Sequence, residues 1–259
     1  MKRKGKVDGK VGGRDSGQES GEEPGKKTHP AVEWLKSILI AAVLFLVIRT
    51  FVLQTFVIIS GSMEDTLLVG DYLVANRLAL GSRIPGLGIR IPGYSEPHRG
   101  DVVVFDPHHD IDERLVKRLI GFPGDTLEMR DATLIVNGTA LPEPYLKPDT
   151  RADARSADFE WQREYLTGDV DRGAYTPSRR TWGPLVVPAD HYFLLGDNRG
   201  DSYDSRYWGP LAAWRLAGRV SFIYFSFNKG SYRPFPALRE IRWSRLGPFR
   251  SGVPEEPGR

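Results

Sequence analysis

The sequence predicts a mainly β protein that begins with a transmembrane helix, and three observations lead to this fold class. Beyond residue 51 the apolar segments are short and rich in β-branched and aromatic residues, which is typical of strands. No long stretch of helical period competes with them. One unbroken apolar run, residues 38–48, precedes them all. The 259 residues suffice for a domain with a real hydrophobic core behind a membrane anchor.

Residues 1–30 are predicted to form a disordered basic tail. They hold eight Lys and Arg against five Asp and Glu, with Val7 and Val11 as their only aliphatic pair, so burial cannot offset the entropy of ordering them. The rest of the chain holds 28 residues of each sign, so the whole excess of +3 lies in the tail. This distribution argues against a nucleic-acid-binding face and favours an anionic membrane surface beside the tail.

Residues 31–51 are predicted to form the transmembrane anchor. The apolar run counts eleven residues, fewer than the roughly 20 that a span usually needs. Lys36 and Arg49 flank the run, so a helix over the whole segment would be about 30 Å long with a cation near each end, where long side chains reach the headgroups. A cleaved signal peptide and a buried amphipathic helix of a soluble protein are the alternatives.

The distribution of cations around the anchor predicts its orientation. Residues 1–36 contain nine Lys and Arg, whereas residues 51–76 contain none. By the positive-inside rule the tail is cytoplasmic and the remainder of the chain lies on the outer face of the cytoplasmic membrane.

Seven strands are expected after the anchor, in the order 72–75, 101–105, 115–120, 126–129, 134–136, 192–195 and 220–227. Asn137-Gly138 suits the type I′ turn of a tight hairpin. Residues 147–184 are charged and aperiodic and are interpreted as a long surface insertion. The expected domains are therefore the tail, the anchor, a β domain over 52–230 with this insertion, and a C-terminal extension over 231–259.

The absence of cysteine restricts the chemistry. It excludes disulfides, thiolate metal sites and a cysteine nucleophile. A His and Asp cluster at 108–113 matches no metal motif and is interpreted as a solvated turn, so neither a metal nor a cofactor is predicted. Any catalysis must then come from oxygen and nitrogen groups.

Four short motifs follow the anchor. They are Ser-Gly-Ser-Met at 60–63, Arg-Gly-Asp-Val-Val-Val-Phe at 99–105, Lys-Arg within a segment that ends Gly-Phe-Pro-Gly-Asp at 121–125, and Gly-Asp-Asn-Arg at 196–199 followed by Asp-Ser-Arg at 204–206. Taken singly, each is an ordinary turn or strand.

Together and in this order, the motifs resemble those of bacterial type I signal peptidases, and the resemblance covers roughly residues 34–227. It implies a catalytic β domain of twisted antiparallel sheets on a membrane anchor. It also implies a serine endopeptidase that removes N-terminal signal peptides from exported preproteins after small residues such as Ala-x-Ala, with preproteins and membrane lipid as partners.

The resemblance implies that Ser62 is the nucleophile and Lys117 the general base of a Ser-Lys dyad. Such a base must be uncharged, and bringing a lysine near neutrality at pH 7 costs about 4 kcal/mol. Burial on the apolar strand 115–120 is a source for this energy. Arg118 keeps its charge under the same conditions, and strand alternation directs its side chain to the other face.

Further residues receive supporting roles from the resemblance. The backbone N–H of Ser62 and the hydroxyl of Ser60 would hold the oxyanion. Ser202 would orient the lysine, and Asp204 with Arg206 would support the site.

The substrate is expected to bind as an added strand with small side chains in shallow pockets. Candidates for the pocket lining are Ile58, Met63, Leu67 and Val116, for each of which plain core packing is an equal alternative.

The chain departs from the family pattern at three positions. Asp65 stands where the family commonly has Pro, and Gly200 and Asp201 stand where Asp and Asn are common. Two other functions stay open at this stage. One is a noncatalytic anchored β domain that binds envelope partners. The other is a Ser-Lys self-cleaving repressor-type protease, which would have no use for a membrane segment.

Overall fold

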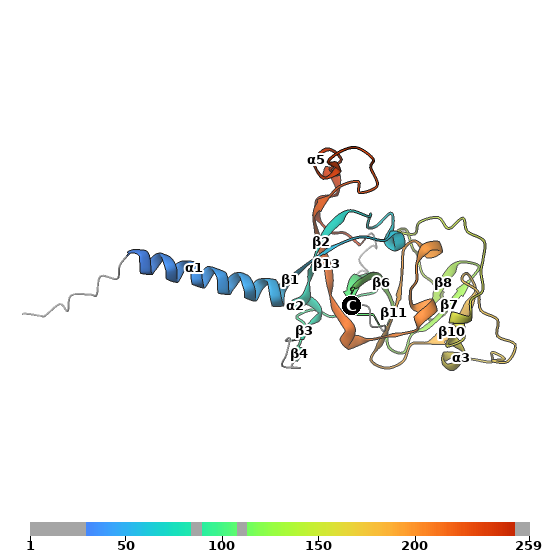
Figure 1. Ribbon diagram of the computed structural model, residues 1–259. Helices are drawn as coiled ribbons and strands as arrows, with labels where there is room; N and C mark the ends of the chain where they lie inside the picture. Colours follow the sequence, from blue (N-terminus) through green and yellow to red (C-terminus); the bar gives the residue numbers. More distant parts are fainter. Residues whose placement is uncertain (1–29, 84–89, 108–112, 252–259) are drawn as a thin grey trace, which may run out of the picture. The chain divides into compact units, whose positions relative to one another are not determined.

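The computed structural model describes residues 30–83, 90–107 and 113–251 (Figure 1). The predicted tail lies outside these residues except for Pro30, and so does the cluster at 108–113 except for the exposed Glu113.

The predicted anchor is helical. Helix α1 (Pro30–Val47) is followed by one π-helical turn, η1 (Ile48–Val52). Within the described part of the chain, no helix has both the length and the apolar character needed to cross a membrane. Helix α1 counts 18 residues, and Glu33 and Lys36 lie in its first two turns. The predicted helix is therefore confirmed, whereas its spanning of a membrane is not.

An eight-stranded antiparallel sheet positions most of the motifs (Figure 1). Its order is β1 (Leu53–Val57), β2 (Asp71–Asn76), β13 (Leu216–Ser226), β5 (Val102–Phe105), β6 (Leu115–Gly121), β11 (His191–Leu195) and β12 (Leu211–Ala212), with β14 (Gly247–Pro248) paired to β13. Strand β13 is the longest and bridges β2 and β5 through several register shifts.

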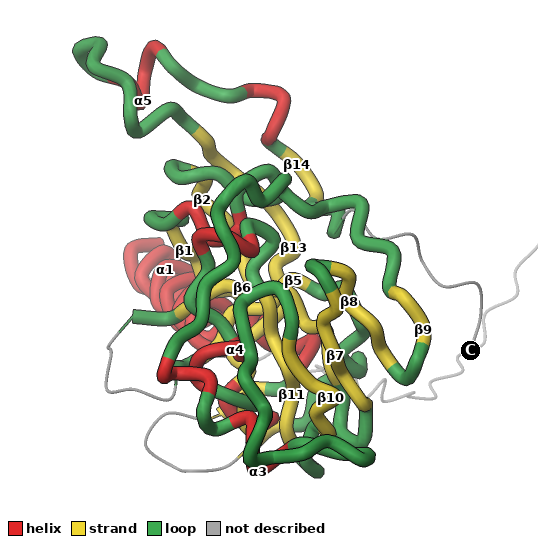
Figure 2. The backbone as a smooth tube through the Cα atoms, turned by 90° about the vertical axis from the view of Figure 1, so that its right-hand side faces the viewer, coloured by secondary structure: helices red, strands yellow, loops and turns green. Residues whose placement is uncertain are grey.

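A second sheet of four antiparallel strands follows the order β10 (Trp182–Val186), β7 (Thr126–Arg130), β8 (Thr133–Val136) and β9 (Thr139–Ala140), and Figure 2 shows these strands grouped together. Val136 pairs with Thr139 across the predicted hairpin, and both turn residues, Asn137 and Gly138, have positive φ. This is the backbone that a type I′ turn requires. Strands β3 (Ser82–Arg83) and β4 (Arg90–Ile91) form a small separate pair.

The helices of the β domain are single turns. They are η2 (Gly61–Met63), α2 (Arg77–Leu80), η3 (Ala157–Phe159), α3 (Gln162–Tyr165), η4 (Arg199–Asp201), α4 (Ser205–Trp208), η5 (Ala213–Arg215), α5 (Pro236–Arg239) and η6 (Trp243–Arg245). All seven predicted strands are present, with ends that differ by up to a few residues. The prediction of a mainly β fold built from antiparallel sheets is confirmed.

The interpretation of 147–184 as a surface insertion is only partly right. Several of its side chains are buried and join the hydrophobic core around β7 and β11, among them Leu166, Tyr175 and Trp182. These apolar residues are spaced too irregularly to show a period, so their burial depends on long-range packing that the local pattern does not reveal.

The C-terminal extension also belongs to the fold. Strand β14 pairs with β13, and Arg245 forms an ion pair of 2.6 Å with the buried Asp71 at the start of β2. The extension thus fastens the strand that follows the Ser-Gly-Ser-Met motif.

Candidate active site

Ser62 lies in the 3-10 turn η2, on the connection between β1 and β2. The N–H groups of Thr66 and Leu67 donate to the carbonyl of Met63. A hydrogen bond of 2.9 Å from the Gly70 N–H to the Ile58 carbonyl joins the two ends of the connection. The Ser62 side chain is only 8% exposed. The Ser-Gly-Ser-Met motif therefore forms a compact turn with its second serine directed inward.

Lys117 lies on β6, where it pairs with Val103 of β5. Its Nζ donates a hydrogen bond of 2.6 Å to the Oγ of Ser62, which is 55 residues away in the sequence. The lysine is 4% exposed, and among the described residues no carboxylate forms an ion pair with it. Burial lowers its pKa to about 8, against the opposing charges of Asp204 and Asp197.

The loop after β11 brings a second group of residues to the dyad. Asn198 binds this loop to the turn of Ser62, since its N–H donates to the Ser62 carbonyl at 3.1 Å and its Nδ2 to the Gly61 carbonyl at 3.0 Å. The backbone of this loop comes close to the turn of Ser62 at Gly196. A Cβ atom there would lie 2.5 Å from the Cβ of Ser202 and 2.6 Å from the Ser62 carbonyl oxygen. Glycine at this position lets the two loops touch.

Asp204 and Arg206 form a fully buried ion pair of 2.8 Å. Asp204 also caps α4 by accepting from the Arg206 N–H, and it accepts from the Gly196 N–H at 3.0 Å. Burial alone would raise the pKa of the Asp204 carboxyl, but the Arg206 guanidinium and these hydrogen bonds hold it below its usual value. A charged Asp204 is thus fixed within the electrostatic range of Lys117.

Ser202 and Ser60 lie near the dyad without strong contacts to it. The Oγ of Ser202 is buried and makes no hydrogen bond of ordinary geometry in the described structure, although it lies close enough to Asp204 to help lower that pKa. No hydrogen bond joins it to Lys117 within the described ranges. The hydroxyl of Ser60 lies 3.5 Å from the Oγ of Ser62 on the exposed side of the turn.

The four predicted pocket residues share one hydrophobic cluster beside the dyad. Ile58, Met63 and Leu67 are buried in it, and Val116 packs against it while partly exposed. Met63 and Val116 are the chain neighbours of Ser62 and Lys117, and the packing of all four residues is compatible with either pocket wall or core.

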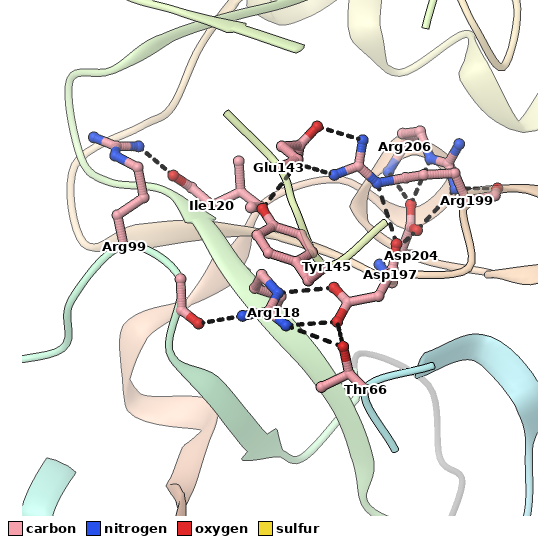
Figure 3. Close-up of polar contacts among 12 residues, drawn as sticks. Thr66, Arg99, Arg118, Ile120, Glu143, Tyr145, Asp197, Arg199, Asp204 and Arg206 are labelled. Atoms are coloured by element: carbon pink, nitrogen blue, oxygen red, sulfur yellow. Dashed lines mark hydrogen bonds and ion pairs between the residues drawn. The ribbon is translucent and has the colours of Figure 1, made fainter. Parts of the chain in front are cut away.

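Arg118, the neighbour of Lys117 on β6, is the centre of a polar network around its ion pair with Asp197 (Figure 3). Arg118 donates to both carboxylate oxygens of Asp197, at 2.8 and 2.6 Å, and to the carbonyls of Gly100 and Ser251, at 2.7 Å each. Its guanidinium also lies 3.6 Å from the ring centre of Tyr145. Asp197 in turn accepts from the hydroxyl of Thr66, four residues after Ser62, at 2.5 Å.

Comparison with known proteins identifies the family. Residues 31–225 match the family described as signal peptidase, peptidase S26. This chain belongs to the signal peptidase family.

Curated relatives agree with the family assignment. Signal peptidase I of Bacillus licheniformis is 37% identical over 204 residues, which are 78% of this chain and 93% of the relative. Signal peptidase I of Pseudomonas aeruginosa is 37% identical over 226 residues, 83% of this chain and 78% of the relative. The crystal structure of a signal peptidase I from Enterococcus faecalis is 32% identical, covers 48% of this chain and 97% of its own, and has a TM-score of 0.32.

Two departures of this signal peptidase from the family pattern have a structural counterpart. Asp65 has a φ of 77°, a left-handed backbone that proline, fixed near −65°, cannot adopt. The turn behind Ser62 therefore takes a path that is closed to proline. At Gly200, a Cβ atom would overlap the carboxylate of Asp149.

Sequence reasoning did not assign roles to Asp197, Thr66 or the C-terminal Ser251. Asp197 was part of the Gly-Asp-Asn-Arg motif, and a carboxylate directly after the apolar strand 192–195 is the signal that it has a buried partner. Ser251 gave no signal, because its contact with Arg118 is made by a backbone carbonyl 133 residues away.

Proposed function

We propose that this signal peptidase removes signal peptides from exported preproteins with Ser62 as nucleophile and Lys117 as general base. The observation that carries the proposal is the 2.6 Å hydrogen bond between Lys117 Nζ and Ser62 Oγ, in a site that lowers the pKa of the lysine to about 8. A neutral amine at this distance is able to accept the hydroxyl proton.

The reaction proceeds in two halves. Ser62 Oγ attacks the scissile carbonyl carbon while Lys117 Nζ takes its proton, and the resulting tetrahedral intermediate collapses as the protonated lysine gives that proton to the leaving amine. This leaves an ester between Ser62 and the signal peptide. Water then attacks the ester carbonyl, Lys117 accepts a proton from the water, and the proton returns to Ser62 Oγ when the carboxylate product leaves.

The oxyanion of each intermediate is proposed to be held by the N–H of Ser62 and the hydroxyl of Ser60, which lies on the exposed side from which a substrate arrives. One such donor is typically worth about 3–4 kcal/mol of transition-state stabilisation. Ser202 is proposed to hold the lysine in line, through a hydroxyl that is already buried in the same loop contact.

The substrate is proposed to bind in extended form beside the turn of Ser62, with small side chains against Ile58, Met63, Leu67 and Val116. Three of the four residues are buried, so a large substrate side chain would require them to repack, which supports the proposal of cleavage after Ala-x-Ala.

Helix α1 is proposed to attach the enzyme to the cytoplasmic membrane, with the N-terminus cytoplasmic and the catalytic domain on the outer face. Its apolar side chains are exposed, with Trp34 at 74%, Ile40 at 67% and Phe45 at 60%, and eight of the nine Lys and Arg of residues 1–36 precede it. Fractionation of cells tests this, since the enzyme should stay with membranes after alkaline extraction and be released from them by a truncation that removes residues 1–48.

The dyad is tested with the full chain and a preprotein that carries Ala-x-Ala before its cleavage site. The parent and the exposed-lysine control Lys229→Ala should release the signal peptide, and Ser62→Ala and Lys117→Ala should not. Equal processing by all four proteins would overturn the dyad. No processing by the parent would instead favour a noncatalytic binding domain.

A further inference from the structure

A short segment, residues 147–151, crosses between the turn of Ser62 and the loop after β11. We call this segment the strap. At its start, Lys147 forms an ion pair of 2.7 Å with Glu64 on the turn, and its N–H donates to the Asp197 carbonyl at 3.2 Å. At its end, Arg151 forms an ion pair of 3.0 Å with Asp201 and a hydrogen bond of 2.6 Å to the Gly200 carbonyl. The strap therefore touches both loops that carry the proposed catalytic machinery.

Asp149 fixes the middle of the strap. Its Oδ1 accepts from the Arg151 N–H at 3.0 Å, and its Oδ2 forms an ion pair of 3.2 Å with Arg179. The side chains of Asp149 and Arg179 are only 13% and 7% exposed, unlike the solvated pairs at the two ends. Arg179 also donates to the Ala152 carbonyl at 2.9 Å. One buried cation therefore binds both the middle of the strap and the residue that follows it.

Gly200 fits against Asp149 because it has no side chain. A Cβ there would overlap Asp149 Oδ1 and lie 3.0 Å from its Cγ and 3.3 Å from the Cδ of Arg151. The φ of Gly200 lies outside the left-handed region, so the backbone itself would accept any residue. Position 200 requires glycine because any side chain there would enter the space that Asp149 fills.

We infer that the strap holds the loop of Ser202 and Asp204 against the turn of Ser62, with Asp149 as a positioning residue for the Ser-Lys dyad. The inference rests on the proposed function, because it is the dyad that the strap aligns. The loop carries Asp197 and Asp204, the two carboxylates whose charges raise the pKa of Lys117. A displaced loop changes both the geometry at Ser62 and the charge around the base.

The test exchanges the aspartate of position 149 and the glycine of position 200. In Gly200→Asp the new side chain displaces Asp149 from Arg179, and kcat for the preprotein should fall about 10- to 100-fold, the scale of a misplacement near 1 Å. In Gly200→Asp combined with Asp149→Gly the clash is gone and the carboxylate stands beside Arg179 again, so kcat should return to within about threefold of the parent.

The matched control is Gly230→Asp, at an exposed glycine that also lacks a left-handed φ and whose Cβ would meet only Asn228 Oδ1, at 3.6 Å. It should leave kcat unchanged. A second variant, Asp149→Asn, keeps the shape and removes the charge, and should lower kcat about 3- to 10-fold with an unfolding temperature close to that of the parent.

The pH profile of kcat separates positioning from a loss of fold. A displaced loop moves the acid limb that reports Lys117, whereas partial unfolding reduces the amount of active enzyme and leaves the limb in place. Full activity of Gly200→Asp, failure of the double variant to recover, or Asp149→Asn with parent kcat and parent pH profile would each overturn the strap. These results stand apart from a failure of the dyad, which would show as cleavage by Ser62→Ala.

Discussion

Lys117 and Arg118 are neighbouring cations on β6, and both are buried, yet the chain surrounds them in opposite ways. Arg118 makes five hydrogen bonds to carboxylate, hydroxyl and carbonyl oxygens and stacks on Tyr145. For Lys117, the described part of the chain offers a single hydrogen bond, to Ser62, and no ion pair. Arg118 is paired directly with the carboxylate of Asp197, whereas among the described residues no carboxylate is in direct contact with Lys117.

The difference separates the structural charge of Arg118 from the proposed base, Lys117. Burial without a partner favours the neutral amine, which lowers the pKa of Lys117 from 10.5 to about 8 and corresponds to about 3 kcal/mol. Arginine remains charged at any accessible pH, so the site on the other side must supply acceptors. The alternation of a strand lets two adjacent residues meet these two environments.

The largest expected effect on stability comes from removing the guanidinium of Arg118. Arg118→Met removes the partner of the buried Asp197 and should destabilise the protein by about 3–5 kcal/mol, because an uncompensated charge then remains in the interior. Denaturant unfolding of the parent and variant measures this. Arg233→Met, at an ion-paired but 76% exposed arginine, is the control and should change stability by less than about 0.5 kcal/mol. A loss for Arg118→Met as small as that of the control would contradict the contrast.

Removing the other cation should have the opposite sign. Lys117→Met should abolish cleavage, and at pH 7 it should stabilise the protein by about 1–3 kcal/mol, because the cost of burying the amine disappears. The folded pKa lies below the unfolded value of 10.5, so the parent gains stability as the pH rises from about 8 towards 10.5. The advantage of the variant should therefore shrink over that range. Denaturant unfolding at pH 7 and pH 10 checks it, and a less stable variant at pH 7 would refute it.

The features that the sequence predicted are those that local patterns determine. Strand β6 follows from a short apolar segment that contains β-branched residues, and the turn at Asn137-Gly138 follows from a residue pair that accepts positive φ. The positions of Ser62 and Lys117 followed from the order of the motifs, and the structure brings the two side chains into contact.

The missed features are long-range. Arg118 and Asp197 are 79 residues apart, and the position of Asp197 after an apolar strand indicates a buried partner without indicating which residue it is. The segment 147–184 was interpreted as surface because its buried residues, such as Phe159 and Trp182, are separated by charged stretches. Asp149 carried no signal at all, since its role depends on a glycine 51 residues later.

The smallest predicted effect concerns a charge on the Lys117 side of the comparison. Asp204, fixed by Arg206, is the carboxylate with the largest influence that raises the pKa of Lys117. Because the neutral lysine is the proposed base, kcat/KM of the parent should rise with pH through about 8. Asp204→Asn keeps the shape of the side chain and removes its charge, so the pKa of Lys117 should fall and the acid limb should move to lower pH.

The measurement is the full pH profile of kcat/KM. The pH at which kcat/KM rises reports the pKa of the base, whereas the maximum of kcat/KM reports the alignment of the site. A shift of the acid limb can therefore be read even if the variant is slower than the parent. Asp169→Asn, at an exposed carboxylate outside the site, should leave the limb where it is in the parent. If the limb of Asp204→Asn stays in place or moves to higher pH, then the group that titrates is not a lysine beside this carboxylate. In that case Lys117 would lose its proposed role as the base, although its contact with Ser62 would remain.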